Sequence, residues 1–103
     1  MDDLSQVGSK VLLENDKVRI WEFRLEPGAR SPLHEHKHDY ILVQISGDRI
    51  AVEPDPRTRG AYNAYTEAEV HPGQVLYIER GGIEVAYNCG KEPYYEIEIE
   101  LKD

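Results

Sequence analysis

Hydrophobic and polar residues alternate along most of the chain with a period of two. Between Val18 and Leu25, the side chains of Trp21, Phe23 and Leu25 share one face, and arginine or glutamate stands between them. Side chains on a β-strand project alternately to its two faces, so this pattern predicts a strand with one buried face. No window of helical length has the apolar spacing that an amphipathic helix requires. We therefore expect an all-β protein.

Six further stretches are predicted strands, separated by turns that contain glycine, proline or asparagine: residues 40–46, 49–53, 62–70, 74–79, 83–87 and 95–101. The run Tyr40–Ser46 is almost continuously apolar, which is typical of a strand covered on both faces. In the last stretch, tyrosine, isoleucine and leucine define one face, and we expect Glu96, Glu98 and Glu100 to form a solvated outer face. Roughly eight short strands of this kind predict a sandwich or a jelly-roll-type β-barrel.

Length and charge narrow the class of protein. The chain has 103 residues, which suits one domain over residues 1–103. Its 12 basic and 20 acidic residues give a net charge of −8, which argues against nucleic acid and anionic lipid as partners. No apolar run approaches the ~20 residues that cross a bilayer, and the N-terminus lacks the features of a secretory signal. Cys89 is the only cysteine, so we expect no internal disulfide and a cytoplasmic location.

Three of the four histidines stand within five residues, at positions 34, 36 and 38. His34 and His36 are two residues apart, so in an extended chain both imidazoles project to the same side. Such a pair could offer two nitrogen ligands to one transition-metal ion. His38 has the same parity, although a kink before the next strand would redirect it. The alternative is a polar loop of solvated histidines; the density of the cluster favours a metal site.

The cluster belongs to the first of two spaced motifs. The first motif resembles that of the cupin family and reads Gly28, five residues, His34-x-His36, three residues, Tyr40, six residues and Gly47. The run from Pro72-Gly73 to Asn88-Cys89-Gly90 resembles the second cupin motif. The likeness extends from about residue 18 to residue 101. It implies a small single-domain cupin, a jelly-roll-type antiparallel β-barrel that holds a metal among inward-facing side chains.

A narrower resemblance adds to the first. The order His-x-His-x-x-Asp-Tyr followed by Ile-Leu-Val, with the ending Glu-Ile-Glu-Leu-Lys, is similar to small cupins grouped with a beta-alanine degradation protein.

The chain departs from the family pattern at two ligand positions. Tyr40 stands where the family has glutamate, and Glu84 stands where it has a third histidine. The resemblance therefore implies the metal set His34, His36 and Glu84, with open coordination positions. Such a set suits non-haem iron(II), while manganese, nickel and zinc stay open as divalent alternatives. We expect Tyr40 beside the metal as a hydrogen-bond donor with a catalytic role.

Asp39 has two interpretations. It either orients a ligating imidazole through its far nitrogen or is a surface carboxylate after a turn.

The local pattern and the family spacing predict opposite orientations for Glu84. Plain alternation places Ile83, Val85 and Tyr87 in the core and leaves Glu84 in water, whereas the family spacing turns Glu84 inward. We expect the inward register. If Glu84 faced water instead, the third ligand would have to be His38 or a water molecule.

These observations support two functional hypotheses. The first is an enzyme that uses its metal on a small polar organic molecule, by dioxygenase-type chemistry with iron or isomerase- or lyase-type chemistry with zinc or manganese. The second is a non-enzymatic barrel that binds or senses a small molecule and whose metal site has degenerated. In both cases the run from Tyr40 to Ile45, which is apolar on both faces apart from Gln44, predicts a homodimer.

Overall fold

The computed structural model describes residue 4 and residues 6–103, and within these it contains nine strands and no helix. The strands are β1 (Lys10–Glu14), β2 (Val18–Leu25), β3 (His34–Glu35), β4 (Tyr40–Ser46), β5 (Arg49–Pro54), β6 (Thr66–Glu69), β7 (Val75–Ile78), β8 (Ile83–Tyr87) and β9 (Tyr94–Leu101). The prediction of an all-β fold is confirmed. Over the same residues, nothing resembles a helix that could cross a membrane.

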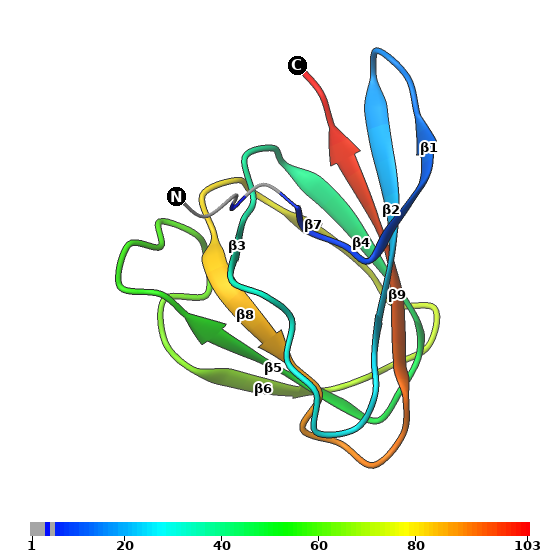
Figure 1. Ribbon diagram of the computed structural model, residues 1–103, viewed down its shortest axis with the longest axis vertical. Coiled ribbons are helices and arrows are strands. Elements are labelled where there is room, and N and C mark those ends of the chain that lie inside the picture. The colour runs from blue at the N-terminus through cyan, green and yellow to red at the C-terminus, as the bar shows by residue number, and fades with distance from the viewer. Residues whose placement is uncertain (1–3, 5) are drawn as a thin grey trace.

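The strands form two antiparallel sheets that face each other (Figure 1). One sheet has the order β1-β2-β9-β4-β7 and the other has the order β3-β8-β5-β6. From β2 onward the chain passes back and forth between the sheets, and only β5 and β6 follow one another within the same sheet. This interleaving produces the jelly-roll-type barrel that the turn spacing predicts.

The predicted and observed strand boundaries agree to different degrees. The observed β2, β4 and β8 begin and end at the predicted residues, whereas the predicted strand over residues 62–70 is reduced to Thr66–Glu69. Two strands were not predicted. β1 is exposed along its whole length and shows no alternation, and β3 has only two residues.

The orientation of β9 reverses the expectation. Glu96, Glu98 and Glu100 are all buried, with at most 6% of each residue exposed, and the alternating isoleucines are half-buried on the outside. The prediction of a solvated glutamate face is therefore wrong. In the ladder between β2 and β9, Trp21 lies opposite Glu98, so the aromatic face of β2 and the glutamate face of β9 point into the barrel together.

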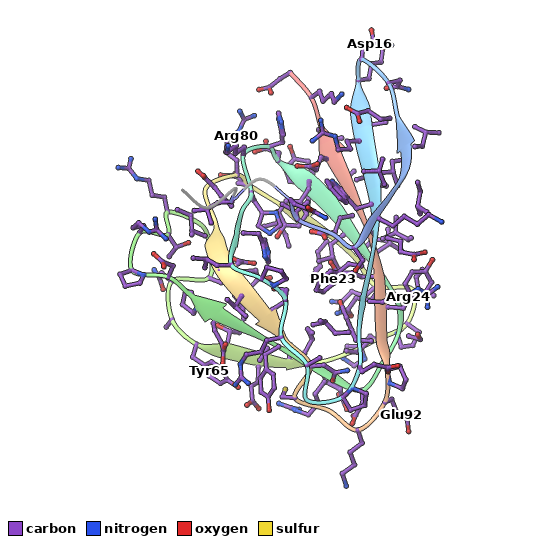
Figure 2. The ribbon with its side chains drawn as sticks, viewed as in Figure 1. Asp16, Phe23, Arg24, Tyr65, Arg80 and Glu92 are labelled. Carbon is purple, nitrogen blue, oxygen red and sulfur yellow. The ribbon has the colours of Figure 1, made fainter. Side chains whose placement is uncertain are left out.

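A small hydrophobic core fills one end of the barrel. It consists of Phe23, Leu25, Val70 and Tyr94, and the rings of Phe23 and Tyr94 meet edge to face at 6.4 Å. Figure 2 shows Phe23 directed between the sheets and its neighbour Arg24 directed away from them. Leu25 ends β2 opposite Tyr94, which begins β9, so the core lies where these two strands meet. The middle of the barrel is left for the site.

The structure explains why the first motif ends in a glycine, Gly47. It joins β4 to β5 with a φ of 139°, which side chains rarely tolerate, and an added Cβ would come within 2.8 Å of the Tyr94 ring. A glycine at this position therefore allows both the turn and the packing of the core.

Candidate metal centre

Two histidines of the cluster reach the barrel interior from an extended segment. His34 lies in β3. The backbone pairing continues past the end of this strand: the His36 N–H donates to the Gly82 carbonyl at 2.8 Å, and the Gly81 N–H donates to the His36 carbonyl at 2.9 Å. His34 and His36 are both buried. The shared orientation predicted from their two-residue spacing is confirmed.

Glu84 completes the group from the neighbouring strand. In the ladder between β3 and β8 it lies opposite His34, and its Oε2 is 3.6 Å from His36 Nε2. One ligand atom from each of His34, His36 and Glu84 lies within 4.8 Å of the other two. Glu84 is 6% exposed, so the inward register is the observed one and plain alternation gives the wrong face for this strand.

The Glu84 carboxylate is short of positive charge. No described residue donates a hydrogen bond to it, and its one ion-pair contact is the imidazole of His36. Burying an ionised carboxylate without a cation or donors costs several kcal/mol. A cation bound among the three side chains would remove that cost, so the donor set fits a metal ion.

His34 is held in a form that suits a ligand. Its Nδ1 lies 3.0 Å from the carbonyl oxygen of Pro32, and only a protonated Nδ1 can donate to a carbonyl. The proton is thereby assigned to Nδ1, and Nε2 keeps its lone pair. Burial, followed by the neighbouring His36, lowers the pKa of His34, so the ring is neutral at pH 7.

Tyr40 packs on the group without hydrogen bonding to it. Its ring is stacked on that of His36, with centroids 4.2 Å apart and planes 15° apart. Burial, and then the negative charge of Glu84, raises the pKa of Tyr40 well above its ordinary value, so it remains a neutral phenol. The expected hydrogen bond from Tyr40 to a ligating residue is not formed among the described residues.

The remaining polar candidates lie elsewhere. The chain turns after His36, and His38 Nδ1 lies 3.8 Å from Asp103, outside the group. Asp39 accepts hydrogen bonds from the Tyr77 hydroxyl and from the backbone and side chain of Arg80. Of its two interpretations, the surface carboxylate is therefore the correct one.

Gly82 is a site residue that the sequence reasoning treated only as a turn. An added Cβ would lie 2.8 Å from Glu84 Oε1 and 3.5 Å from His36 Cδ2. The missing side chain gives the carboxylate its room. A glycine two residues before an inward-facing ligand candidate is the signal that could have indicated this.

The group opens into a cavity of about 340 Å³ between the two sheets. The sheet that holds β8 contributes His34, His36 and Glu84, and the opposite sheet contributes polar side chains from β4 and β9: Tyr40, Gln44, Tyr94, Glu96 and Glu98. Aliphatic residues, among them Leu42, Ile50 and Leu76, line much of the rest. A cavity of this size with a few polar groups in its walls suits a small organic molecule.

Two histidines and one carboxylate leave coordination positions free for other ligands. Imidazole and carboxylate donors of this kind suit iron(II), and they also bind manganese, nickel and zinc. The group His34, His36 and Glu84 is thus a possible site for a divalent transition metal.

Solved structures resemble the whole barrel. A cupin domain from Bordetella pertussis Tohama I superposes with a TM-score of 0.79 at 20% identity, covering 100% of this chain and 99% of that one. A cupin superfamily protein from Desulfitobacterium hafniense superposes with a TM-score of 0.65 at 21% identity, covering 100% and 84%. A cupin with a double-stranded β-helix fold from Methanocaldococcus jannaschii gives 0.71 at 14% identity, covering 90% and 77%.

One curated protein is similar in sequence. The Beta-alanine degradation protein BauB of Pseudomonas aeruginosa is 27% identical over 102 residues, which cover 99% of this chain and all of that protein. No family model matches the chain. The structural likenesses establish the fold.

Proposed function

This chain has the cupin fold, and we propose that it binds a divalent transition metal at His34, His36 and Glu84 and acts as an enzyme on a small polar organic molecule. The observation that carries the proposal is the buried Glu84 carboxylate, which faces two imidazoles and has no hydrogen-bond donor among the described residues. Such a carboxylate needs a cation, and the adjoining cavity offers space for a substrate beside that cation.

The choice of metal decides the chemistry. Iron(II) would supply oxidation by dioxygen, whereas zinc or manganese(II) would supply Lewis-acid polarisation of a carbonyl, as in an isomerase or lyase. The protein side of the reaction falls to Tyr40. As a buried neutral phenol in the cavity wall, it can orient or protonate an oxygen of the bound molecule.

The sequence likeness to BauB supports a role with small metabolites. The name of that protein connects it with the degradation of beta-alanine, and the likeness extends along the full length of both chains. We therefore propose a small-molecule ligand for this chain.

A second candidate is a barrel that binds or senses a small molecule without catalysis. It is favoured by Tyr40, which replaces the fourth ligand of the family pattern and contacts His36 by stacking alone. The two candidates differ in whether the protein takes up metal.

Elemental analysis of purified protein tests the proposal. Protein from cells grown with added iron, manganese, nickel and zinc should contain close to one metal per chain. The double variant His34→Ala/His36→Ala should contain almost none, while its far-UV circular dichroism keeps the β-sheet signature. His71→Ala is the matched control, because His71 is exposed and stands outside the group.

Either of two results would overturn this assignment. Unchanged metal content in the double histidine variant would refute the site. A wild-type protein that contains no metal and takes up none on titration would favour the non-enzymatic barrel.

A further inference from the structure

The cavity wall opposite the metal group contains a pair of buried carboxyl groups that the proposed metal does not use. Glu96 and Glu98 lie on β9, each at most 6% exposed, and both line the cavity. They are two residues apart in β9, so both side chains project to the same face of the strand. The cavity therefore has two neighbouring carboxyl groups in one wall.

A short chain of hydrogen bonds leads to this pair. Gln44 Nε2 donates to the Tyr94 hydroxyl at 3.3 Å, and that hydroxyl donates to Glu96. The arrangement fixes Glu96. Glu98 is two residues further along the same face of β9 and also lines the cavity.

Tyr40 supplies an independent indication of a missing ligand. It is 3% exposed, it lines the same cavity, and its hydroxyl has no hydrogen-bond partner within residues 4 and 6–103. Tyr40 lies opposite Glu100 in the ladder between β4 and β9, so it belongs to the same wall of the cavity as Glu96 and Glu98. Because the described chain offers this hydroxyl no partner and it faces the cavity, a molecule bound there can supply one.

The cavity also lacks a fixed positive charge. Four glutamates line it, at positions 69, 84, 96 and 98, and none of the described residues that line it is a lysine or an arginine. A metal ion at the histidines would offset the charge of Glu84 on the opposite sheet. The carboxyl pair on β9 would still have no cationic partner.

We propose that this wall of the cavity recognises an organic cation, and specifically the primary ammonium group of the molecule on which the protein acts. A primary ammonium has three N–H donors, and the wall offers three acceptors in Glu96, Glu98 and the Tyr40 hydroxyl. Because it names the class of substrate, this inference rests on the proposed function.

The shape of the cavity favours an organic cation over a second metal ion. About 340 Å³ is far more than one ion needs, and the aliphatic side chains of Leu42 and Leu76 beside the carboxyl groups suit a carbon chain. An anionic molecule would meet the carboxyl pair with no basic residue to offset the repulsion.

Calorimetric titration with three four-carbon probes tests the inference. At pH 7.5, 1-butylamine is a cation, 1-butanol is neutral and butanoate is an anion. Metal-free wild-type protein should bind butylammonium at least about tenfold more tightly than butanol, and butanoate most weakly. The double variant Glu96→Gln/Glu98→Gln keeps the size of both side chains and removes the charge of the pair, and it should lose most of this preference. Glu92→Gln is the matched control, because Glu92 is exposed on the loop before β9.

A variant that cannot bind metal separates the test of ammonium binding from the test of the metal site. The double variant His34→Ala/His36→Ala should keep the preference for butylammonium, because the carboxyl wall belongs to the other sheet. Equal binding of butanol and butylammonium by the wild type would overturn the inference, with or without a folded Glu96→Gln/Glu98→Gln variant. So would an unchanged preference in that folded variant. Displacement of butylammonium from the double variant by manganese(II) would assign the wall to a second metal and also overturn it.

Discussion

His34 and Glu84 are directly opposite each other in the antiparallel ladder between β3 and β8. Side chains at such positions have Cβ atoms about 5 Å apart and point to the same face of the sheet. Backbone pairing, rather than a loop, therefore sets the separation of these two ligand candidates. His36 is held against β8 in the same way, through its hydrogen bonds to Gly81 and Gly82. A group fixed by sheet hydrogen bonds is ready for an ion before the ion arrives.

The charge of Glu84 should matter more for metal binding than for folding. We expect Glu84→Gln to weaken metal affinity at least tenfold, about 1.4 kcal/mol, because the amide cannot offset the charge of the ion. Isothermal titration with zinc or manganese(II) measures this, and circular dichroism checks the fold. Glu92→Gln serves as the exposed control. An affinity equal to that of the wild type would remove Glu84 from the ligand set.

Metal binding should also depend on the space beside Gly82. The Cβ of Gly82→Ala would come within 2.8 Å of Glu84 Oε1, and the carboxylate would have to move. We expect metal affinity to fall by about tenfold or more. Adding Glu84→Asp, which withdraws the carboxylate by one methylene, should restore part of the loss. If Gly82→Ala binds metal as well as the wild type, the carboxylate has more freedom than the close approach indicates.

The buried carboxyl pair should make the metal-free protein less stable as the pH rises. Burial raises the pKa of Glu96 from its ordinary 4.5 to about 7. Between these values the folded state retains a proton that the unfolded state has released, so the free energy of unfolding falls as the pH rises through this range. For Glu96 alone the loss is on the order of 3 kcal/mol. His34 acts in the opposite sense, because its lowered pKa reduces stability as the pH falls below about 6.5.

Urea denaturation at pH 5 and pH 8 separates the two effects. The variant Glu96→Gln has no titrating group at this position, so its stability relative to the wild type should be higher at pH 8 than at pH 5. Glu92→Gln should show no such change, because Glu92 is exposed. Parallel pH profiles for the wild type and Glu96→Gln would show that the carboxyl pair does not titrate in this range.

We also expect a homodimer that is formed through the outside of the larger sheet. One apolar row crosses all five of its strands: Leu13 lies beside Ile20, followed by Ile99, Ile41 and Tyr77. Tyr77 is 59% exposed, and Val75 and Ile45 nearby are 60% and 41% exposed. A continuous apolar face of this kind is commonly covered by a second copy, with two-fold symmetry.

Light scattering measures the assembly. The wild type should have about twice the single-chain mass of 11.8 kDa at micromolar concentration, and Ile99→Glu should be a monomer that still takes up metal. Ile99 stands between two inward-facing glutamates in β9, so its side chain points away from the cavity. A wild-type mass near that of one chain would contradict this prediction.

Local pattern was sufficient to locate seven of the nine described strands and part of the site. The alternation in β2 and the apolar run of β4 gave their boundaries, and the two-residue spacing placed His34 and His36 on one side. These properties depend on the geometry of a single strand. The likeness to cupins added the inward direction of Glu84, against the local alternation. The sequence was thus sufficient to predict an all-β barrel. The partners of the chain stay predictions.

For β9, only the tertiary structure decided which face is the inside. Alternation divides β9 into a glutamate face and an isoleucine face, and the usual assumption sends the isoleucines to the core. The barrel reverses it, because its interior is a cavity with a polar wall, while the outer surface of the larger sheet is apolar. The hydrogen-bonded register with β2, which aligns Glu98 with Trp21, imposes the choice. That register links residues far apart in the chain, so no local pattern in the sequence contains it.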